Sequence, residues 1–446
     1  MRKYFGPGTD QPIEFWPDEK RRAYQTEAVA EQLEHVYHNN SFYRRKLDSA
    51  GMKPSDFRTL EDLGRFPFTT KDELRGDPWV LLSLPKDEVC LVHASTGTTG
   101  GAWSYILYSR QDMYVRDIAP FMHVLMPVRA SDVVINALPY EMSSSGQSFQ
   151  RSLQEGTGAL VVPVGKGGFY SDPYKTAQIM AELRADVLIT TPPYAMLLSE
   201  VAEQKGLLLG RDIKLRFIWL TGEGCSPAYR RRLEECWGCP GLIFYGSMEC
   251  GSIGIECPAQ SGLHVCEGHV YLEVIDPKTG HPQPAGKIGE VVCTVLQRRA
   301  SPLIRFRTQD LAFADPAPCS CGTRFSKLHI RGRIADQVRA GQEDDPVPTI
   351  SPYLIEESLY SEGEMGNNYQ VYVDGARLVI HAEGRAGAGD DARTRILELL
   401  RKRGMNAELH WVAHIPRTGG KTRRVRLWSE RGEVMNTPSL LRRSHP

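Results

Sequence analysis

The chain has 446 residues, more than one ordinary hydrophobic core encloses, so we expect two or three domains. Hydrophobic residues make up 41% and charged residues 24%, as in a globular protein. The 54 basic and 54 acidic residues cancel, so net charge favours neither nucleic acid nor a membrane as a partner. The first 20 residues lack an apolar signal region and no long apolar run follows, which, with 10 cysteines, predicts a reduced, cytoplasmic setting.

Apolar residues at helical spacing over 18–50 predict amphipathic helices. From Asp132, β-branched runs such as DVVINALPY alternate with helix-like pieces such as DPYKTAQIMAELR, which predicts a largely parallel α/β layer. Alternation over 269–296 predicts an antiparallel β region. We therefore predict an α/β fold with a large N-terminal domain, residues 1–333, and a small mobile α+β C-terminal domain, residues 334–446, that ends in a polar tail.

Residues 94–104 read ASTGTTGGAWS, a stretch of glycines and hydroxyl residues without charge. Glycine allows close backbone approach to a ligand, and N–H groups with Ser and Thr hydroxyls can bind a phosphate. No lysine follows the last glycine, so the stretch is not a Walker loop. Alone it predicts either a phosphate-binding loop or an ordinary flexible turn.

Four further stretches follow in order: YGSMECG at 245–251, RFRTQDL at 305–311, IRGRIAD at 330–336 and PRTGGKTRR at 416–424. Together with the first they resemble the adenylate-forming acyl-CoA synthetase superfamily, and over nearly its whole length the chain is most similar to the phenylacetate–CoA ligase family. The resemblance implies that a carboxylate attacks the α-phosphate of ATP, giving an acyl adenylate and pyrophosphate, and that CoA then takes the acyl group. The first step depends on positioning and charge neutralisation.

The resemblance also assigns roles to the motif residues. It implies that Glu249 binds Mg²⁺, that Asp310 takes the ribose hydroxyls with Arg333 nearby, and that Lys421 swings in to stabilise charge during adenylation. A further group is expected to bind the phosphates, the adenine and the rest of the nucleotide: Ser95, Thr96, Gly97, Thr98, Thr99, Gly100, Gly222, Glu223, Gly224, Tyr245 and Gly246. Gly224 stands where relatives often carry an acid, so only backbone contact is implied there. Tyr245 is expected beside the adenine or the substrate ring, with a core position as the alternative.

The acid pocket is expected from residues 138–150 and 190–196, with Tyr140, Ser145, Phe149 and Tyr194 as contacts. Relatives that take phenylacetate carry glycine and phenylalanine where this chain has a serine cluster. The cluster favours a more polar aromatic acid, such as a hydroxy- or amino-substituted one. A serine-rich loop without a role in selectivity is the alternative.

Four residues are candidates for a structural zinc site: Cys257, His264, Cys319 and Cys321. Zinc prefers four soft or borderline ligands in a tetrahedron, commonly as two short-spaced pairs. The resemblance also implies zinc here, since some members of the family bind zinc at this place. Cys266 is a rival fourth ligand, and free cysteines in a reduced protein are the alternative.

The chain departs from thioester-forming relatives after Arg333. Ala335 replaces the first aspartate of the usual hinge, Asp336 keeps the second, and the following loop carries Glu343, Asp344 and Asp345. Acidic residues at the expected entry of the polyanionic CoA would repel its phosphates. The acceptor therefore stays open between CoA, an amine, and an aryl amine treated with nitrite as in related diazotases. A nucleotide-binding protein without catalysis and a homodimer are further hypotheses.

Overall fold

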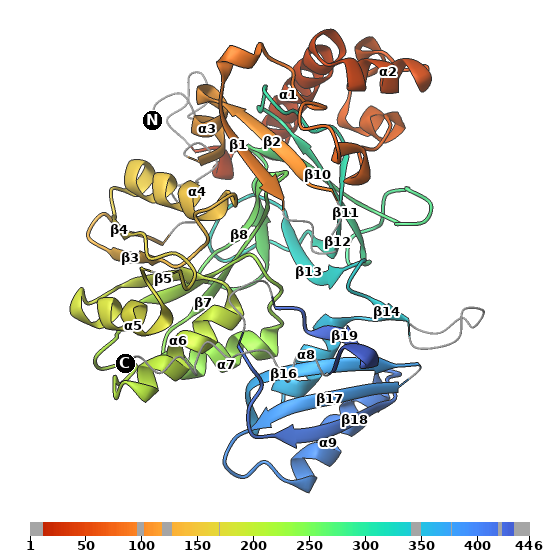
Figure 1. Ribbon diagram of the computed structural model, residues 1–446. Helices are drawn as coiled ribbons and strands as arrows, with labels where there is room; N and C mark the ends of the chain where they lie inside the picture. The colour runs from red at the N-terminus through yellow and green to blue at the C-terminus, as the bar shows by residue number, and fades with distance from the viewer. Residues whose placement is uncertain are drawn as a thin grey trace.

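The computed structural model describes residues 12–95, 102–117, 127–168, 170–339, 349–375, 377–417 and 422–431. A large body extends from the N-terminal helices to β13, and a smaller body of strands and helices lies below it, beyond β14 (Figure 1). We call the smaller body, residues 349–431, the C-terminal unit. Within the described ranges, every helix is too short or too polar to serve as a membrane span.

The large body is organised around one 11-stranded sheet of strand order β10-β11-β12-β13-β9-β8-β7-β6-β5-β3-β4. Its parallel part consists of β4 (Leu160–Val162), β3 (Val133–Asn136), β5 (Val187–Thr190), β6 (Phe217–Leu220) and β7 (Gly241–Ser247). Strands β5 and β6 are buried throughout, as expected for short Val-, Leu- and Ile-rich strands covered on both faces. The predicted α/β fold class is confirmed.

Strand β7 is the junction of this sheet, because it is parallel to β6 and antiparallel to β8. The antiparallel part consists of β8 (Gly251–Glu256), β9 (Leu263–Val265), β13 (Lys327–Arg333), β12 (Phe306–Asp315), β11 (Gly289–Val295) and β10 (Val270–Ile275). A separate hairpin, β1 (Val89–Ser95) with β2 (Ser104–Ser109), lies above the junction (Figure 1). The sheet therefore changes from parallel to antiparallel pairing at β7, the strand on which the YGSMECG motif begins.

Four helices cover the parallel part of the sheet: α4 (Ser145–Arg151), α5 (Pro173–Glu182), α6 (Pro192–Gln204) and α7 (Pro227–Trp237). A further helix, α3 (Arg110–Asp117), packs against β2 and α4. Proline stands in the first turn of α5, α6 and α7, where its missing N–H costs no hydrogen bond. The side chain of Ser226 accepts a hydrogen bond from the N–H of Tyr229 and so caps α7.

The N-terminal helices pack against the antiparallel part of the sheet. These are α1 (Asp18–Asn39) and α2 (Ser41–Ser49). Val29, Leu33 and Val36 form the buried face of α1. On the same side, Gln32 donates hydrogen bonds of 3.0 and 2.9 Å to the carbonyls of Val295 and Arg298. The predicted amphipathic helices are thus present, and they anchor the start of the chain to residues near 300.

The C-terminal unit is a 4-stranded sheet of order β18-β17-β16-β19 with two helices on one face. Its elements are α8 (Pro352–Tyr360), β16 (Met365–Asp374), β17 (Arg377–Gly384), α9 (Asp390–Lys402), β18 (Ala407–Val412) and β19 (Val425–Leu427). The unit begins with β15 (Thr349–Ile350), which pairs with β14 (Val338–Arg339) just before it.

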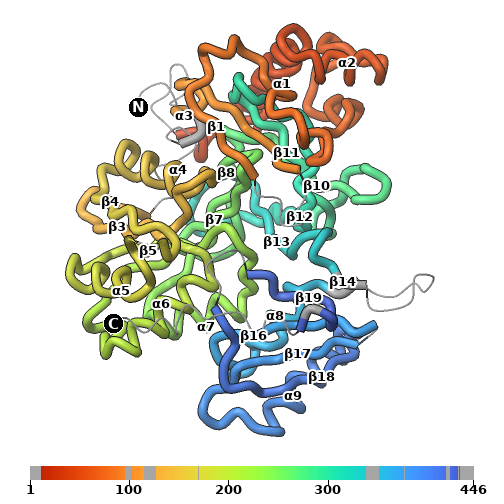
Figure 2. The backbone as a smooth tube through the Cα atoms, in the orientation of Figure 1, coloured from red at the N-terminus to blue at the C-terminus, as the bar shows by residue number. Residues whose placement is uncertain are grey.

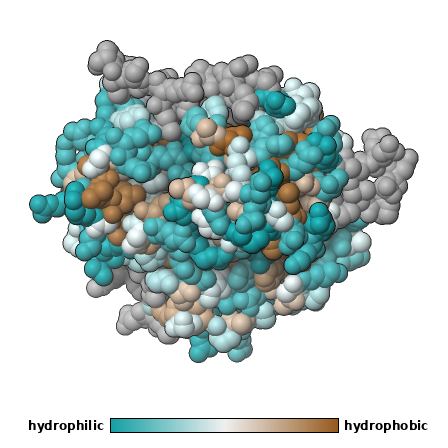
Figure 3. Space-filling model, turned by 90° about the horizontal axis from the view of Figure 1, so that it is seen from below, coloured by the Kyte–Doolittle hydropathy of each residue, from teal (hydrophilic) through white to brown (hydrophobic). Residues whose placement is uncertain are grey.

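The two bodies pack directly against each other. One buried hydrophobic cluster continues from α6 and α7 into α8 and β16, and the rings of Tyr229 and Tyr360 lie 4.5 Å apart across the boundary. The tube drawing shows the same close approach of α7 to β16 (Figure 2). Seen from below, the surface is mainly hydrophilic, and its hydrophobic areas are separated from one another (Figure 3).

Candidate active site

The predicted nucleotide residues of β7, β12 and β13 converge in the structure. Asp310 accepts a hydrogen bond of 2.7 Å from the hydroxyl of Tyr245 and one of 2.8 Å from Nε of Arg333. Asp310 and Arg333 face each other in the antiparallel register of β12 and β13. The Asp310 carboxylate raises the pKa of the Arg333 guanidinium, and burial raises the pKa of Tyr245 well above its ordinary value.

The backbone before Asp310 adopts an uncommon conformation. Gln309 has a φ of +63°, in the left-handed region that few residues other than glycine adopt. The N–H of Gln309 donates a hydrogen bond of 3.1 Å to the buried carboxylate of Glu290, which holds this conformation. A strained backbone persists only where the surrounding structure holds it in place, and such residues cluster at functional sites.

Glu249, the predicted magnesium ligand, is a buried carboxylate in the turn between β7 and β8. Burial by itself would raise the pKa of Glu249, but the ion pair with Lys71, whose Nζ lies 2.9 Å away, holds that pKa below its ordinary value. Glu249 is therefore a charged ligand for a hard cation. Lys71 was not predicted as a site residue, since a lysine in the charged stretch TTKDELR is typical of a surface position.

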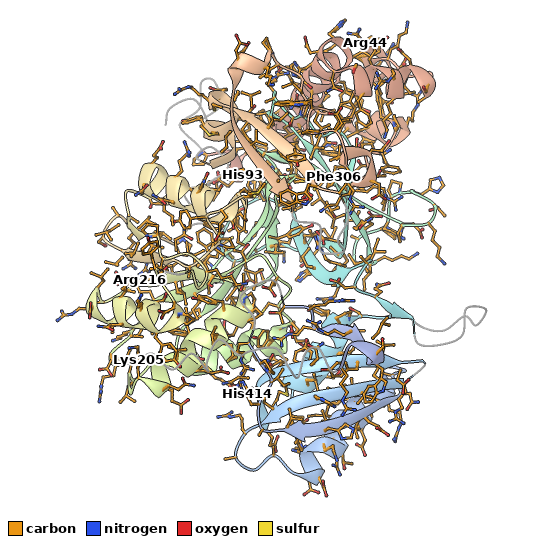
Figure 4. All side chains as sticks on the ribbon, in the orientation of Figure 1. Arg44, His93, Lys205, Arg216, Phe306 and His414 are labelled. Atoms are coloured by element: carbon orange, nitrogen blue, oxygen red, sulfur yellow. The ribbon has the colours of Figure 1, made fainter. Side chains whose placement is uncertain are left out.

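The hairpin of β1 and β2 positions the start of the predicted phosphate loop. Ser95 ends β1, and its hydroxyl lies 2.6 Å from that of Ser104 at the start of β2. His93, on the same strand, is buried, and its Nδ1 lies 3.3 Å from the carbonyl oxygen of Met142 (Figure 4). The remaining loop residues Thr96, Gly97, Thr98, Thr99 and Gly100, and the catalytic candidate Lys421, lie outside the described residues.

The predicted adenine loop follows β6. Gly222 has a φ of +81°, which favours glycine, and Gly246 is required because a Cβ there would lie 2.7 Å from the carbonyl oxygen of Gly251. The side chain of Glu223 does not face solvent but forms an ion pair of 3.1 Å with Lys166. It also accepts a hydrogen bond of 3.1 Å from the N–H of Thr422 in the C-terminal unit. Backbone contact alone was predicted for Gly224, the next residue.

Three of the four predicted acid-pocket residues lie together around β3 and α4. The hydroxyl of Tyr140 accepts a hydrogen bond of 2.8 Å from Asn136, and Ser145 lies 3.0 Å from the hydroxyl of Ser143. Phe149 is buried, with its ring 5.2 Å from that of Trp219 and 4.8 Å from that of Phe244.

Tyr194 lies elsewhere, in a small cavity between α6 and the C-terminal unit, with Tyr369 and Arg424. Burial raises the pKa of Tyr194 above its ordinary value. Tyr140 therefore lies on the segment between β3 and α4, Ser145 begins α4, Phe149 packs into the aromatic core, and Tyr194 lies at the boundary of the two bodies.

The four candidate zinc ligands form one group, with all their ligand atoms within 4.8 Å of one another. Sγ of Cys257 lies 3.6 Å from Sγ of Cys319, and Sγ of Cys321 lies 3.4 Å from Nε2 of His264. Cys266, the rival ligand, is buried outside this group. Burial raises the pKa of Cys319, but hydrogen bonds from the Cys321 backbone and Ser261 outweigh it and lower that pKa to about 7, toward the thiolate that binds metals. The donor set and spacing fit a tetrahedral zinc ion.

The structure describes the first part of the altered hinge, up to residue 339. Ala335 and Asp336 are exposed between β13 and β14. The acidic residues Glu343, Asp344 and Asp345 lie outside the described residues.

Comparisons with known proteins identify the family of this chain. A family model described as AMP-binding enzyme matches residues 24–295. A phenylacetate-coenzyme A ligase of Thermus thermophilus is 34% identical over 371 residues, with 81% of this chain and 80% of the relative covered. The Escherichia coli enzyme of the same name is 30% identical over 376 residues, with 81% of each chain covered.

Among solved structures, a 2-hydroxyisobutyryl-CoA ligase in the postadenylation state, in complex with 2-HIB-AMP, superposes with a TM-score of 0.85 at 24% identity, covering 97% of this chain and 96% of that one. The same ligase in complex with 2-HIB-AMP and CoA in the thioesterification state gives 0.68 at 24% identity, covering 96% of each chain. The two bodies of this chain are therefore arranged more like those of the first structure.

The matched family model and the relatives define an AMP-forming, AMP-binding enzyme. Within that class, the chain belongs to the phenylacetate–coenzyme A ligase family.

Proposed function

We propose that this ligase activates a small aromatic carboxylic acid with ATP and then transfers the acyl group to CoA. The observation that carries the proposal is the convergence of Tyr245, Asp310 and Arg333 beside the buried carboxylate of Glu249. The relatives named phenylacetate-coenzyme A ligase support an aromatic acid and CoA as the substrates.

In the proposed first step, a carboxylate oxygen of the acid attacks the α-phosphorus of ATP, the bond from that phosphorus to the bridging oxygen breaks, and pyrophosphate leaves. Asp310 would bind the ribose hydroxyls, and the loop from Ser95 to Gly100 would bind the phosphates. Lys421 would stabilise the charge that develops. Mg²⁺, held by Glu249, would supply neutralisation of the phosphate charge. In the second step the sulfur of CoA would attack the acyl carbon and release AMP.

For the acid itself we propose a hydroxy- or amino-substituted aromatic ring. Ser145 lies 3.0 Å from the hydroxyl of Ser143, and Tyr140 belongs to the same segment, which also contains Ser144. Hydroxyl groups in a pocket select a substrate with matching polar groups, because an analogue without them leaves the hydroxyls unpaired.

The test is pyrophosphate release with ATP and Mg²⁺ against phenylacetate, hydroxy- and aminobenzoates and cinnamates, with and without CoA, with products identified by mass. We expect release with one aromatic acid and a thioester only when CoA is present. Lys421→Ala is expected to lower release at least 100-fold, about 2.7 kcal/mol of transition-state stabilisation, with nucleotide binding retained. Absence of release with every acid would contradict the proposal.

A second candidate keeps the adenylation and changes the acceptor. It is favoured by Ala335 at the hinge position and by Glu343, Asp344 and Asp345 in the loop that follows. The acceptor would then be an amine, or nitrite would be activated for transfer to an aryl amine. Pyrophosphate release with nitrite, or an adenylate that CoA does not consume, would favour this candidate over the CoA ligase.

A structural zinc ion is the remaining part of the proposal. Cys257, His264, Cys319 and Cys321 would hold it with no open position, so it would stabilise the fold and take no part in the reaction. The site joins the turn after β8 to the turn between β12 and β13.

A further inference from the structure

Two contacts with the large body flank the segment that carries Lys421. On the N-terminal side, Arg417 is 9% exposed and lies between carboxylates of both bodies. It forms an ion pair with Glu200 of α6, with Nε 3.1 Å from Oε2, and two hydrogen bonds of 2.8 Å with Glu383 of β17. His414, three residues earlier, lies at the boundary of the two bodies (Figure 4).

On the C-terminal side, Thr422 follows Lys421 directly. Its N–H donates a hydrogen bond of 3.1 Å to Oε2 of Glu223. This N–H belongs to the peptide group that joins Lys421 to Thr422, so Glu223 contacts the backbone of the lysine segment itself. The other oxygen of Glu223 lies 3.1 Å from Nζ of Lys166, and the two side chains are only 11% and 8% exposed. A buried carboxylate paired in this way has a fixed position.

We propose that Glu200 and Glu223 are positioning residues for the adenylation step: they hold the backbone on both sides of Lys421 against the large body. The contacts of Arg417 and Thr422 lie on the two sides of Lys421 in the sequence, so each carboxylate acts on a described residue that flanks the lysine. The inference rests on the proposed function, in which Lys421 acts in the first step. Neither carboxylate contacts the substrate in this role; each acts through the lysine segment.

Glu200→Ala is the first variant, because Arg417 keeps its partner Glu383 and no buried cation is left unpaired. We expect about a 10- to 100-fold lower rate of ATP–pyrophosphate exchange with the acid that wild type uses, because misplacing a catalytic group by about 1 Å costs on that order. The KM for ATP and the rate of thioester formation from preformed adenylate should stay within about twofold of wild type. Glu200→Gln, which retains an oxygen acceptor, should recover part of the exchange rate.

Glu203→Ala is the matched control, since Glu203 is an exposed glutamate on the same helix, and it should exchange pyrophosphate like wild type. The inference would be overturned if Glu200→Ala lowered the rates of pyrophosphate exchange and of thioester formation by the same factor, or lowered neither rate.

A second measurement does not depend on activity. Amide hydrogen exchange of peptides covering 416–424 is expected to be at least several-fold faster in Glu223→Ala and Glu200→Ala than in wild type and in Glu203→Ala. If wild type activates no acid, the proposed function fails, and this measurement still decides the positioning role. Unchanged exchange in both variants would refute the inference even if the ligase activity is established.

Discussion

At the scale of single residues, buried charges in this protein are paired through specific geometry. Arg305 is 1% exposed, binds Glu273 through two hydrogen bonds of 3.0 and 2.7 Å, and donates to the carbonyls of Gly64 and Phe66. These contacts join β12 to β10 and to the segment after α2. A charge in such a place is tolerated only because its donors are satisfied.

Arg305→Met is expected to destabilise the protein by about 3–5 kcal/mol, because it leaves the Glu273 carboxylate buried without its partner. The midpoint of urea unfolding, followed by circular dichroism, measures the effect. Arg299→Met is the control: its ion pair with Glu31 is solvent-exposed, so its loss should cost less than about 1 kcal/mol. Similar midpoints for the two variants would contradict the prediction.

Lys71 and Mg²⁺ would compete for the same carboxylate of Glu249. We therefore expect Lys71→Gln to lower the Mg²⁺ concentration for half-maximal pyrophosphate release about fivefold, as removal of an ion pair worth about 1 kcal/mol would do. Magnesium titrations at saturating ATP measure it, with the exposed Lys86→Gln as the control. A higher magnesium requirement in Lys71→Gln would mean that Lys71 assists the metal site instead.

At the scale of elements, α1 shows how polar side chains fix the docking of a helix. His35 lies on α1 with Nε2 2.9 Å from the carbonyl oxygen of Arg299, while Nδ1 lies 3.2 Å from Nδ2 of Asn39. The amide of Asn39 donates to Nδ1, so the neutral ring with its proton on Nε2 fits both neighbours. Burial lowers the pKa of His35 below its ordinary value of 6.5.

The lowered pKa of His35 makes the folded protein less stable at low pH. The unfolded chain binds the proton more readily than the folded one, so the contribution of His35 is present above pH 6.5 and is lost as the pH falls toward the lowered pKa. We expect His35→Gln, which retains a donor and does not titrate, to show a shallower fall in melting temperature between pH 8 and pH 5.5. His38→Gln, on the exposed side of the same helix, should follow wild type, and a wild-type slope in His35→Gln would contradict the prediction.

The cysteine group joins two turns of the antiparallel part of the sheet. If zinc occupies it, Cys319→Ser should lose the metal and lower the melting temperature, because a structural zinc contributes directly to folding free energy. Metal analysis and thermal unfolding of the purified full chain, before and after chelation, measure both effects. Cys90→Ser is the control, since Cys90 is exposed and outside the group. Wild-type protein without zinc and indifferent to the chelator would rule the site out.

At the scale of the whole molecule, local patterns in the sequence predicted the fold class and the order of the motifs. The alternation of buried strands with helices after Asp132 is such a pattern, and the structure confirms the α/β class. Contacts between distant segments were not predictable in the same way. Glu223 meets Lys166 across 57 residues and Thr422 across 199, and no local pattern carries that information. The pairing of Tyr245 with Asp310 could be expected only from the resemblance of both motifs to a known family.

The docking of α1 has a consequence for the synthesis of the chain. The partner of Gln32 lies 263 residues later, so α1 leaves the ribosome long before the strand that covers it exists. At about 5–20 residues per second, the interval is roughly 13 to 53 s. During that time α2 and the segment directly after it can cover α1, but the part of its apolar face that packs against the sheet stays without its native surface. We therefore expect the nascent chain to expose apolar surface on α1 until the strand around Val295 has been made, which favours chaperone binding during synthesis.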